Sequence, residues 1–222
     1  MSMEMKTRWI DRQYDAFLRR MGLREAYELK QTGYLKNRGW FRSFEEGRMV
    51  DEEGRPVPWM NYSVVDFLEE RIQADWRVFE YGSGGSTAWW AARVASVTAC
   101  EHDEAWFQRM KDSYSANVKP IHVPLDYDGA YCRAILKEEG VFDVVVSDGR
   151  DRVRCAANAV PKLSGKGIVV LDDFEREKYA AAQVELAKVG FHCLVIGGMK
   201  PKSYDGSRTA IFYRPLQNVL GL

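Results

Sequence analysis

Residues 77–87 read RVFEYGSGGST, in which a short apolar segment leads through Glu80 into a cluster of glycines. An apolar run followed by glycines and then by Ser86 and Thr87 is typical of a buried strand that turns tightly into a helix. Glycine suits such a turn because it has no Cβ to keep the backbone away from a ligand. The free N–H groups at the start of the helix can bind an anionic group. The stretch therefore predicts a strand, a tight turn and a helix at one edge of a sheet.

Five further apolar segments follow, each with the length of a short strand. The six segments cover residues 77–81, 97–101, 121–124, 142–147, 167–171 and 191–196. Helical patterns separate them, and such alternation is typical of a mainly parallel sheet with helices on both faces. The last segment, RTAIFYR at 208–214, follows the turn SYDGS without a helix, which indicates an antiparallel partner. We therefore expect an α/β fold with a doubly wound, seven-stranded, mainly parallel sheet whose last strand is antiparallel.

The first 60 residues lack this alternation. Apolar residues between Ile10 and Met21 follow helical spacing, and a second helix is expected over 23–31. The chain therefore divides into an N-terminal helical and loop extension, residues 1–60, and one α/β domain, residues 61–222.

Residues 33–58 show no regular pattern, and Asn61 or Ser63 can cap the helix that follows them. Aromatic residues are frequent here. Substrate choice is expected to depend on the first 60 residues and on the loop 197–208. Four of the aromatic residues can either cover a planar or sugar-like acceptor or only pack the extension onto the sheet. These four residues are Trp40, Phe41, Trp59 and Tyr62.

A second acidic residue, Glu101, lies 21 positions after Glu80, at the end of the next predicted strand. Doubly wound folds bind nucleosides at the carboxyl ends of their strands, where an acid on the second strand accepts hydrogen bonds from a ribose. A dinucleotide-binding turn would have a small residue in place of Thr87. Glu80 would also repel a pyrophosphate, whereas it would attract a ligand with an ammonium and a sulfonium group. These features disfavour an NAD-dependent oxidoreductase.

The glycine stretch resembles motif I of the class I S-adenosylmethionine (SAM) dependent methyltransferases, an ExGxG pattern formed here by Glu80, Gly82 and Gly84. The resemblance extends over residues 64–214 and makes Glu101 the ribose-binding acid of motif II. It implies SAM as the cofactor, with Glu80 on the side of the methionine ammonium group. The cofactor-binding residues that we expect are Glu80, Tyr81, Gly82, Ser83, Gly84, Ser86, Thr87, Glu101, His102, Asp126 and Asp148.

Several polar residues have a second interpretation. His102 can lie along the adenine edge or in an exposed loop, and Asp126 can accept a hydrogen bond from the adenine amino group or stabilise a turn. Arg150 and Arg152 can hold an anionic substrate, although surface ion pairs are the usual role of such residues.

Three aspartates follow two of the predicted strands. Asp148 comes after FDVVVS, and Asp172 and Asp173 come after GIVVL, so their carboxylates are expected at the same sheet edge. Carboxylate oxygens suit Mg²⁺ or Ca²⁺. The arrangement resembles the metal site of the catechol and caffeoyl-coenzyme A O-methyltransferases, which usually have Asn in place of Asp173. This resemblance implies a metal that activates a hydroxyl group, with Asp148 as the catalytic residue. The alternative is that Asp148 closes the crevice and that Asp172 or Asp173 caps a helix beginning near Phe174.

Composition limits the partners and the location. The 32 Lys and Arg residues balance the 32 Asp and Glu residues, which gives a nucleic-acid partner no overall electrostatic support. The four cysteines form no CxxC pair, and the chain has neither an apolar leader nor a run of 18 apolar residues. We therefore expect a cytoplasmic protein without a membrane partner. Its N-terminal aromatic residues permit a homodimer.

Together these features predict a SAM-dependent methyltransferase. The expected acceptor is a hydroxyl oxygen of a small molecule or glycan, with or without help from Mg²⁺ or Ca²⁺. One alternative is a SAM-binding sensor or scaffold that transfers no methyl group. The other is the NAD-dependent oxidoreductase, which the glycine pattern and the closing antiparallel strand disfavour.

Overall fold

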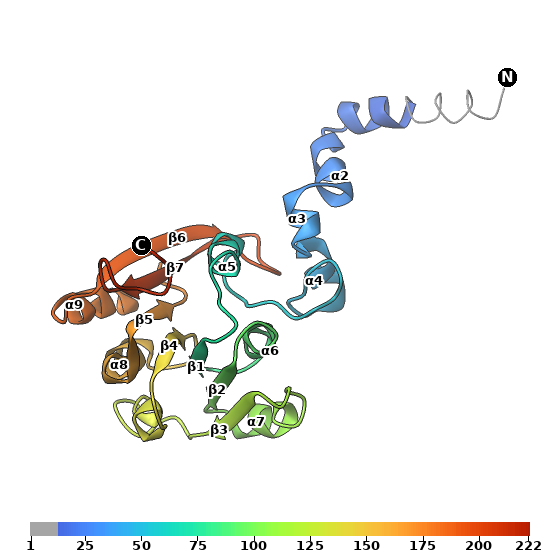
Figure 1. The fold of residues 1–222 in the computed structure, drawn as a ribbon. Helices are drawn as coiled ribbons and strands as arrows, with labels where there is room; N and C mark the ends of the chain where they lie inside the picture. Colours follow the sequence, from blue (N-terminus) through green and yellow to red (C-terminus); the bar gives the residue numbers. More distant parts are fainter. Residues whose placement is uncertain (1–12) are drawn as a thin grey trace.

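A computed structural model describes residues 13–222 and contains one seven-stranded sheet with the order β3-β2-β1-β4-β5-β7-β6 (Figure 1). The strands are β1 (Arg77–Tyr81), β2 (Ser96–Glu101), β3 (Val118–His122), β4 (Phe142–Ser147), β5 (Leu163–Leu171), β6 (His192–Met199) and β7 (Gly206–Tyr213). Strands β1 to β5 pair in parallel, whereas β7 is antiparallel to both β5 and β6. The predicted sheet, with its antiparallel last strand, is confirmed.

The register of the central strands places their carboxyl ends side by side. Tyr81 at the end of β1 lies opposite Cys100 of β2 and Ser147 of β4, and Ser147 lies opposite Leu171 at the end of β5. The residues that follow these strands therefore meet at one edge of the sheet.

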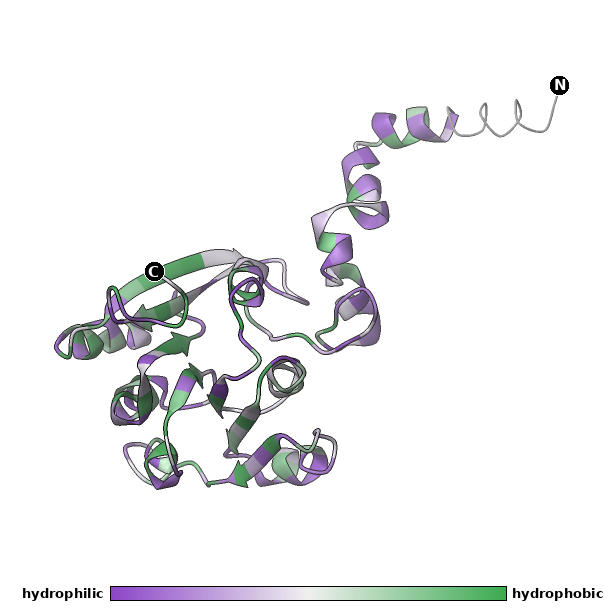
Figure 2. Cartoon of the chain, viewed as in Figure 1, coloured by the Kyte–Doolittle hydropathy of each residue, from purple (hydrophilic) through white to green (hydrophobic). Residues whose placement is uncertain are grey.

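Helices cover both faces of the sheet. They are α5 (Tyr62–Glu69), α6 (Gly85–Ala91), α7 (Glu104–Met110), α8 (Arg152–Ala159) and α9 (Ala181–Ala187), with the 3₁₀ helices η1 (Ala134–Lys137), η2 (Val160–Lys162) and η3 (Glu177–Tyr179). Alternate residues of each strand point to opposite faces. Val78 accordingly packs with Leu68 and Trp90 of α5 and α6, while Phe79 packs with Ile135 of η1 and Cys155 of α8. Figure 2 shows the hydrophobic strands between these layers.

Three local predictions differ from the structure. Strand β3 begins and ends earlier than predicted and contains Pro120, which an edge strand tolerates although it cannot donate a backbone hydrogen bond. Only η1 lies between β3 and β4, where a full helix was expected. No helix begins at Phe174, since the next helical segments are η3 from Glu177 and α9 from Ala181.

The N-terminal segment contains α2 (Arg24–Gln31), α3 (Tyr34–Asn37) and α4 (Trp40–Glu46), and it projects away from the sheet (Figure 1). The predicted helix starting at Ile10 lies partly outside the described residues, but 13–20 are helical. The prediction of no regular structure over 33–58 missed α3 and α4. Each is short and begins after a glycine with positive φ, Gly33 at 93° and Gly39 at 74°, so neither produces a long amphipathic pattern.

Asn61 connects the extension to the sheet. Its side chain accepts a hydrogen bond from the Val64 backbone at 3.0 Å and so caps α5, as predicted. It also donates to Thr209 Oγ1 of β7 at 3.0 Å. Helix α4 is held against the β6–β7 loop, because the Trp40 indole donates to the Ser203 carbonyl at 2.9 Å. Within residues 13–222 no helix is long and apolar enough to cross a lipid bilayer.

Candidate functional site

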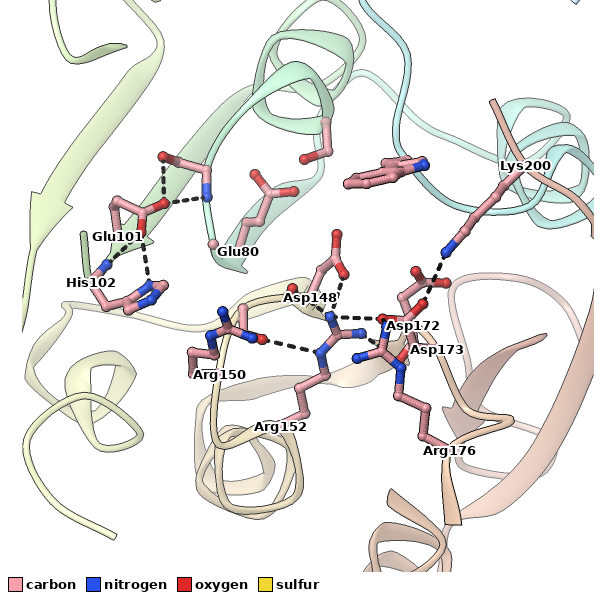
Figure 3. Close-up of a pocket in the computed structure, with 15 residues that line it drawn as sticks. Glu80, Glu101, His102, Asp148, Arg150, Arg152, Asp172, Asp173, Arg176 and Lys200 are labelled. Atoms are coloured by element: carbon pink, nitrogen blue, oxygen red, sulfur yellow. Dashed lines mark hydrogen bonds and ion pairs between the residues drawn. The ribbon is translucent and has the colours of Figure 1, made fainter. Parts of the chain in front are cut away.

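A cavity of about 340 Å³ opens at the carboxyl ends of β1, β2, β4 and β5 (Figure 3). The chain builds the sheet outward from β1 in both directions, with β2 and β3 on one side and β4 and β5 on the other. Doubly wound sheets bind ligands at the point where the strand order reverses in this way. The cavity is lined by Trp59, Glu80, Gly82, Ser83, Ser86, Glu101, His102, Asp148, Gly149, Arg150, Arg152, Asp172, Asp173, Arg176 and Lys200.

The glycine turn brings the ends of β1 and β4 into close contact. Gly82 has φ 94°, and its backbone N–H donates to the Cys100 carbonyl at 2.8 Å. A Cβ on Gly82 would lie 3.2 Å from the Gly149 nitrogen, and one on Gly149 would lie 2.2 Å from the Tyr131 hydroxyl. Glycine is therefore required on both sides of this contact, which forms the floor of the cavity.

Glu80 is fully buried beneath the turn. Its Oε2 accepts a hydrogen bond from the Thr87 hydroxyl at 2.5 Å, while its Oε1 has no hydrogen-bond partner among the described residues. Burial raises the pKa of Glu80 to about 7, the Ser86 and Thr87 side chains oppose this increase, and the charge of Glu101 adds to it. Thr87 also accepts from the Gly84 backbone at 3.0 Å, so its hydroxyl orders the turn.

Glu101 accepts several hydrogen bonds at the end of β2. Its Oε2 accepts from the backbone N–H and the hydroxyl of Ser83, both at 3.0 Å. Its Oε1 accepts from the backbone N–H groups of His102 at 2.7 Å and Asp103 at 2.9 Å, and His102 Nδ1 lies 2.9 Å away. The backbone contacts fix the carboxylate, whereas the Ser83 hydroxyl and the His102 ring belong to side chains that can rotate aside.

The three aspartates predicted at this edge do come together. One carboxylate oxygen from each of Asp148, Asp172 and Asp173 lies within 4.8 Å of the others. Asp172 accepts from the Thr209 hydroxyl at 2.5 Å, and burial raises its pKa to about 6. Burial and the neighbouring Asp172 raise the pKa of Asp148 well above its usual range. The Asp148 side chain is still 24% exposed, because it faces the cavity.

Three basic side chains meet this acidic cluster. Arg152 is buried, and its Nη2 lies 3.0 Å from Asp148 Oδ1 and 3.2 Å from Asp173 Oδ2. Arg176 Nη2 lies 2.8 Å from Asp173 Oδ2, and Lys200 Nζ lies 3.1 Å from Asp173 Oδ1. These cations, with Arg152 first, hold the pKa of Asp173 below its usual range against the effect of burial. Arg152 also donates to the Asp172 carbonyl at 2.6 Å, which ties the end of β5 to α8.

These contacts bear on the predicted metal. Three carboxylates are suitable ligands for Mg²⁺ or Ca²⁺, but both oxygens of Asp173 and one of Asp148 already contact side-chain cations. A divalent cation would have to displace Arg152 from the carboxylates that it bridges. As arranged, the cluster fits a buried arginine better than a metal ion. The usual surface role expected of Arg152 is wrong, since its side chain is only 7% exposed.

Some predicted residues lie outside the cavity lining. Tyr81 points into the core, where its hydroxyl donates to the Cys132 carbonyl at 2.8 Å. Asp126 accepts from the backbone N–H groups of Ala130 and Tyr131 at 2.8 and 2.9 Å, which favours its role in a turn. Gly84 and Thr87 are also absent from the lining, although they shape the turn. His102 lines the cavity, as does Arg150.

Sequence reasoning did not single out Gly149, Arg176 or Lys200. Gly149 and Arg176 follow the strand-end aspartates closely, and this spacing was a usable signal. Lys200 directly follows β6, within the loop 197–208 that the sequence marked for substrate choice, although no single residue of that loop was named.

Comparison with solved structures identifies the same architecture in other proteins. A methyltransferase from Pyrococcus furiosus superposes with a TM-score of 0.53 and 19% identity over 80% of this chain and 94% of its own. An rRNA methylase from Streptococcus thermophilus superposes with a TM-score of 0.51 and 14% identity over 69% of this chain and 95% of its own. A methyltransferase-like protein from Silicibacter pomeroyi superposes with a TM-score of 0.51 and 23% identity over 72% of this chain and 89% of its own.

No protein-family model and no curated protein sequence matches the chain. The sheet order, the antiparallel last strand and these superpositions agree with one another. The chain therefore has the fold of the class I SAM-dependent methyltransferases.

Proposed function

We propose that this protein is a SAM-dependent methyltransferase that acts on a hydroxyl oxygen of a small molecule or glycan. The observation that carries the proposal is the cavity at the strand-order reversal, with Glu80 and Glu101 on one side and Asp148 facing in from the other (Figure 3). SAM, when bound, supplies an electrophilic methyl group on a sulfonium centre.

The residues around the glycine turn fit this cofactor. Glu80 has a buried oxygen without a partner, and an ammonium group is the kind of ligand that would complete its contacts. Glu101 is fixed by backbone donors and can accept from a ribose diol once the Ser83 hydroxyl rotates away. The backbone of Gly82 and Gly84 allows close approach. We assign His102 to the adenine edge because it lines the cavity, whereas Asp126 would reach adenine only by giving up its turn contacts.

Asp148 is the residue that we propose for catalysis. Its carboxylate faces the cavity, and burial raises its pKa toward the range in which a general base accepts a proton from a hydroxyl. Arg152 holds this carboxylate from the side away from Glu80, as Figure 3 shows. Positioning of the acceptor oxygen supplies much of the remaining rate enhancement in such a site.

The proposal does not include metal assistance. The three aspartates offer suitable oxygens, but Arg152, Arg176 and Lys200 compete for them. We therefore assign the activation of the hydroxyl to Asp148 rather than to Mg²⁺ or Ca²⁺.

The extension over residues 1–60 is proposed to cover the acceptor. Trp59 supports this role because it lines the cavity and its side chain is 49% exposed. Trp40, Phe41 and Tyr62 lie outside the cavity lining and pack the extension instead. A small-molecule acceptor and a cytoplasmic location remain our proposals. The balanced charge supports a small-molecule acceptor, because it gives nucleic acid no overall attraction. A homodimer would use the exposed aromatic residues of the extension.

The proposal is tested by transfer of a labelled methyl group from SAM to a panel of diols, sugars and phenols. Activity that is lost in Asp148→Asn and unchanged by a chelator supports the proposal. Transfer that requires Mg²⁺ would restore the metal mechanism. A protein that binds S-adenosylhomocysteine but never transfers a methyl group would instead be a sensor or scaffold.

A further inference from the structure

The cavity has basic groups on the side opposite Glu101. Arg176 comes from the loop after β5 and Lys200 from the end of β6, and Trp59 comes from the connection before α5. Figure 3 shows Arg176 and Lys200 on one side of Asp148, with Glu101 and His102 on the other. Three separate segments therefore build one wall of the cavity, away from the acids that we assign to the cofactor.

The ion pairs on this wall are not one to one. Arg152 contacts both Asp148 and Asp173, and Arg176 and Lys200 also contact Asp173. Within residues 13–222, Arg176 and Lys200 each form a single ion pair, and both pairs are with Asp173. Asp173 is therefore shared by three cations, and Arg176 and Lys200 have no other carboxylate partner among the described residues.

Both cations also keep unused hydrogen-bond donors. A guanidinium group has five N–H donors and an ammonium group has three, but each of these side chains uses one nitrogen on Asp173. The Arg176 side chain is 47% exposed, and Lys200 Nζ lies 5.4 Å from the centre of the Trp59 ring. Donors and an exposed aromatic face therefore lie side by side at the entrance to the cavity.

We propose that the acceptor carries an oxyanion, a carboxylate or a phosphate, which Arg176 and Lys200 bind while Trp59 covers a planar part of the same molecule. This inference rests on the proposed function, because it assumes that the cofactor occupies the side of Glu80 and Glu101. Arginine and lysine bind carboxylates and phosphates through charge-assisted hydrogen bonds. Asp173 orients the two cations, and their remaining N–H donors are available to bind an anion.

The test compares two probes that differ only in the anion. Catechol and 3,4-dihydroxybenzoate share the diol ring, and each is titrated by calorimetry into the protein saturated with S-adenosylhomocysteine. We expect the carboxylate-bearing probe to bind at least about tenfold more tightly, the gain typical of a hydrogen bond to a charged group. In the double variant Arg176→Met, Lys200→Met this preference should disappear.

Two controls separate binding from general effects. Lys188→Met removes one positive charge from an exposed position directly after α9 and should leave the preference unchanged. Arg176→Lys keeps the positive charge and should retain most of it. Circular dichroism checks that each variant is folded.

Equal affinity for the two probes, no binding of 3,4-dihydroxybenzoate, or a preference that survives in the double variant would overturn the proposal. The same titrations are made without S-adenosylhomocysteine. If the cofactor product fails to bind, the proposed function fails, whereas a carboxylate preference that depends on Arg176 and Lys200 would still support the anion site.

Discussion

The buried carboxyl group of Glu80 makes stability depend on pH in a predictable way. Burial raises its pKa from 4.5 to about 7 in the folded protein. Between these two values the folded state binds more protons than the unfolded state, so stability falls as pH rises. A difference of about 2.5 pKa units corresponds to about 3 kcal/mol. This stability is fully present below about pH 4.5 and is lost as pH rises through about 7.

The substitution Glu80→Gln isolates this effect. The amide resembles the protonated carboxyl group and keeps an oxygen that can accept from Thr87, but it does not ionise. Urea denaturation at pH 5 and pH 8.5 gives the free energy of unfolding of both proteins. We expect similar stability at pH 5 and a variant that is more stable by about 3 kcal/mol at pH 8.5. Glu185→Gln, an exposed substitution in α9, controls for the change in charge.

The same group should respond to the cofactor. An ammonium group near Glu80 would favour its ionised form, so binding of S-adenosylhomocysteine at pH 6 should release up to about one proton, and binding at pH 8.5 should release almost none. Calorimetry in buffers with different ionisation enthalpies counts these protons. A stability difference between wild type and Glu80→Gln that is the same at both pH values would refute the argument.

Three further substitutions test the contacts around the cavity. Glu101→Gln should lower the free energy of unfolding by about 1–3 kcal/mol, because either orientation of the amide leaves a backbone N–H without an acceptor. Urea denaturation measures this loss. A variant as stable as the wild type would mean that these hydrogen bonds are not formed. Arg152→Met should lower the free energy of unfolding by about 3–5 kcal/mol, since it leaves buried carboxylates without their cation. A much smaller loss in the same assay would show that the ion cluster does not stabilise the fold. Asn61→Ala should cost about 1–2 kcal/mol by removing the cap of α5. For this variant thermal unfolding suffices, and an unchanged midpoint would contradict the capping role.

The sheet was predictable because its signals are local. The strands Arg77–Tyr81 and Phe142–Ser147 have the predicted bounds, since each is a buried apolar run that a polar or glycine residue ends. The meeting of Asp148 with Asp172 and Asp173 was also predictable, because parallel neighbours end at the same edge. The roles of these residues remain proposals.

Other features depend on contacts between distant segments. Arg152 lies four residues after Asp148, a spacing typical of a surface ion pair, and only the approach of β5 shows that it is buried. Lys200 reaches the cavity from the end of β6, which pairs with β7 rather than with the strands that hold the glycine turn. The short helix α4 is held by the contact of Trp40 with Ser203, which local periodicity does not reveal.

The most direct test of the assigned cofactor is calorimetric titration of the wild-type protein with S-adenosylhomocysteine and, separately, with NADH. We expect saturable binding of one S-adenosylhomocysteine per chain, weakened at least about tenfold in folded Glu101→Gln, and no binding of NADH. Binding of NADH, or no binding of S-adenosylhomocysteine, would contradict the assignment of this cavity to SAM.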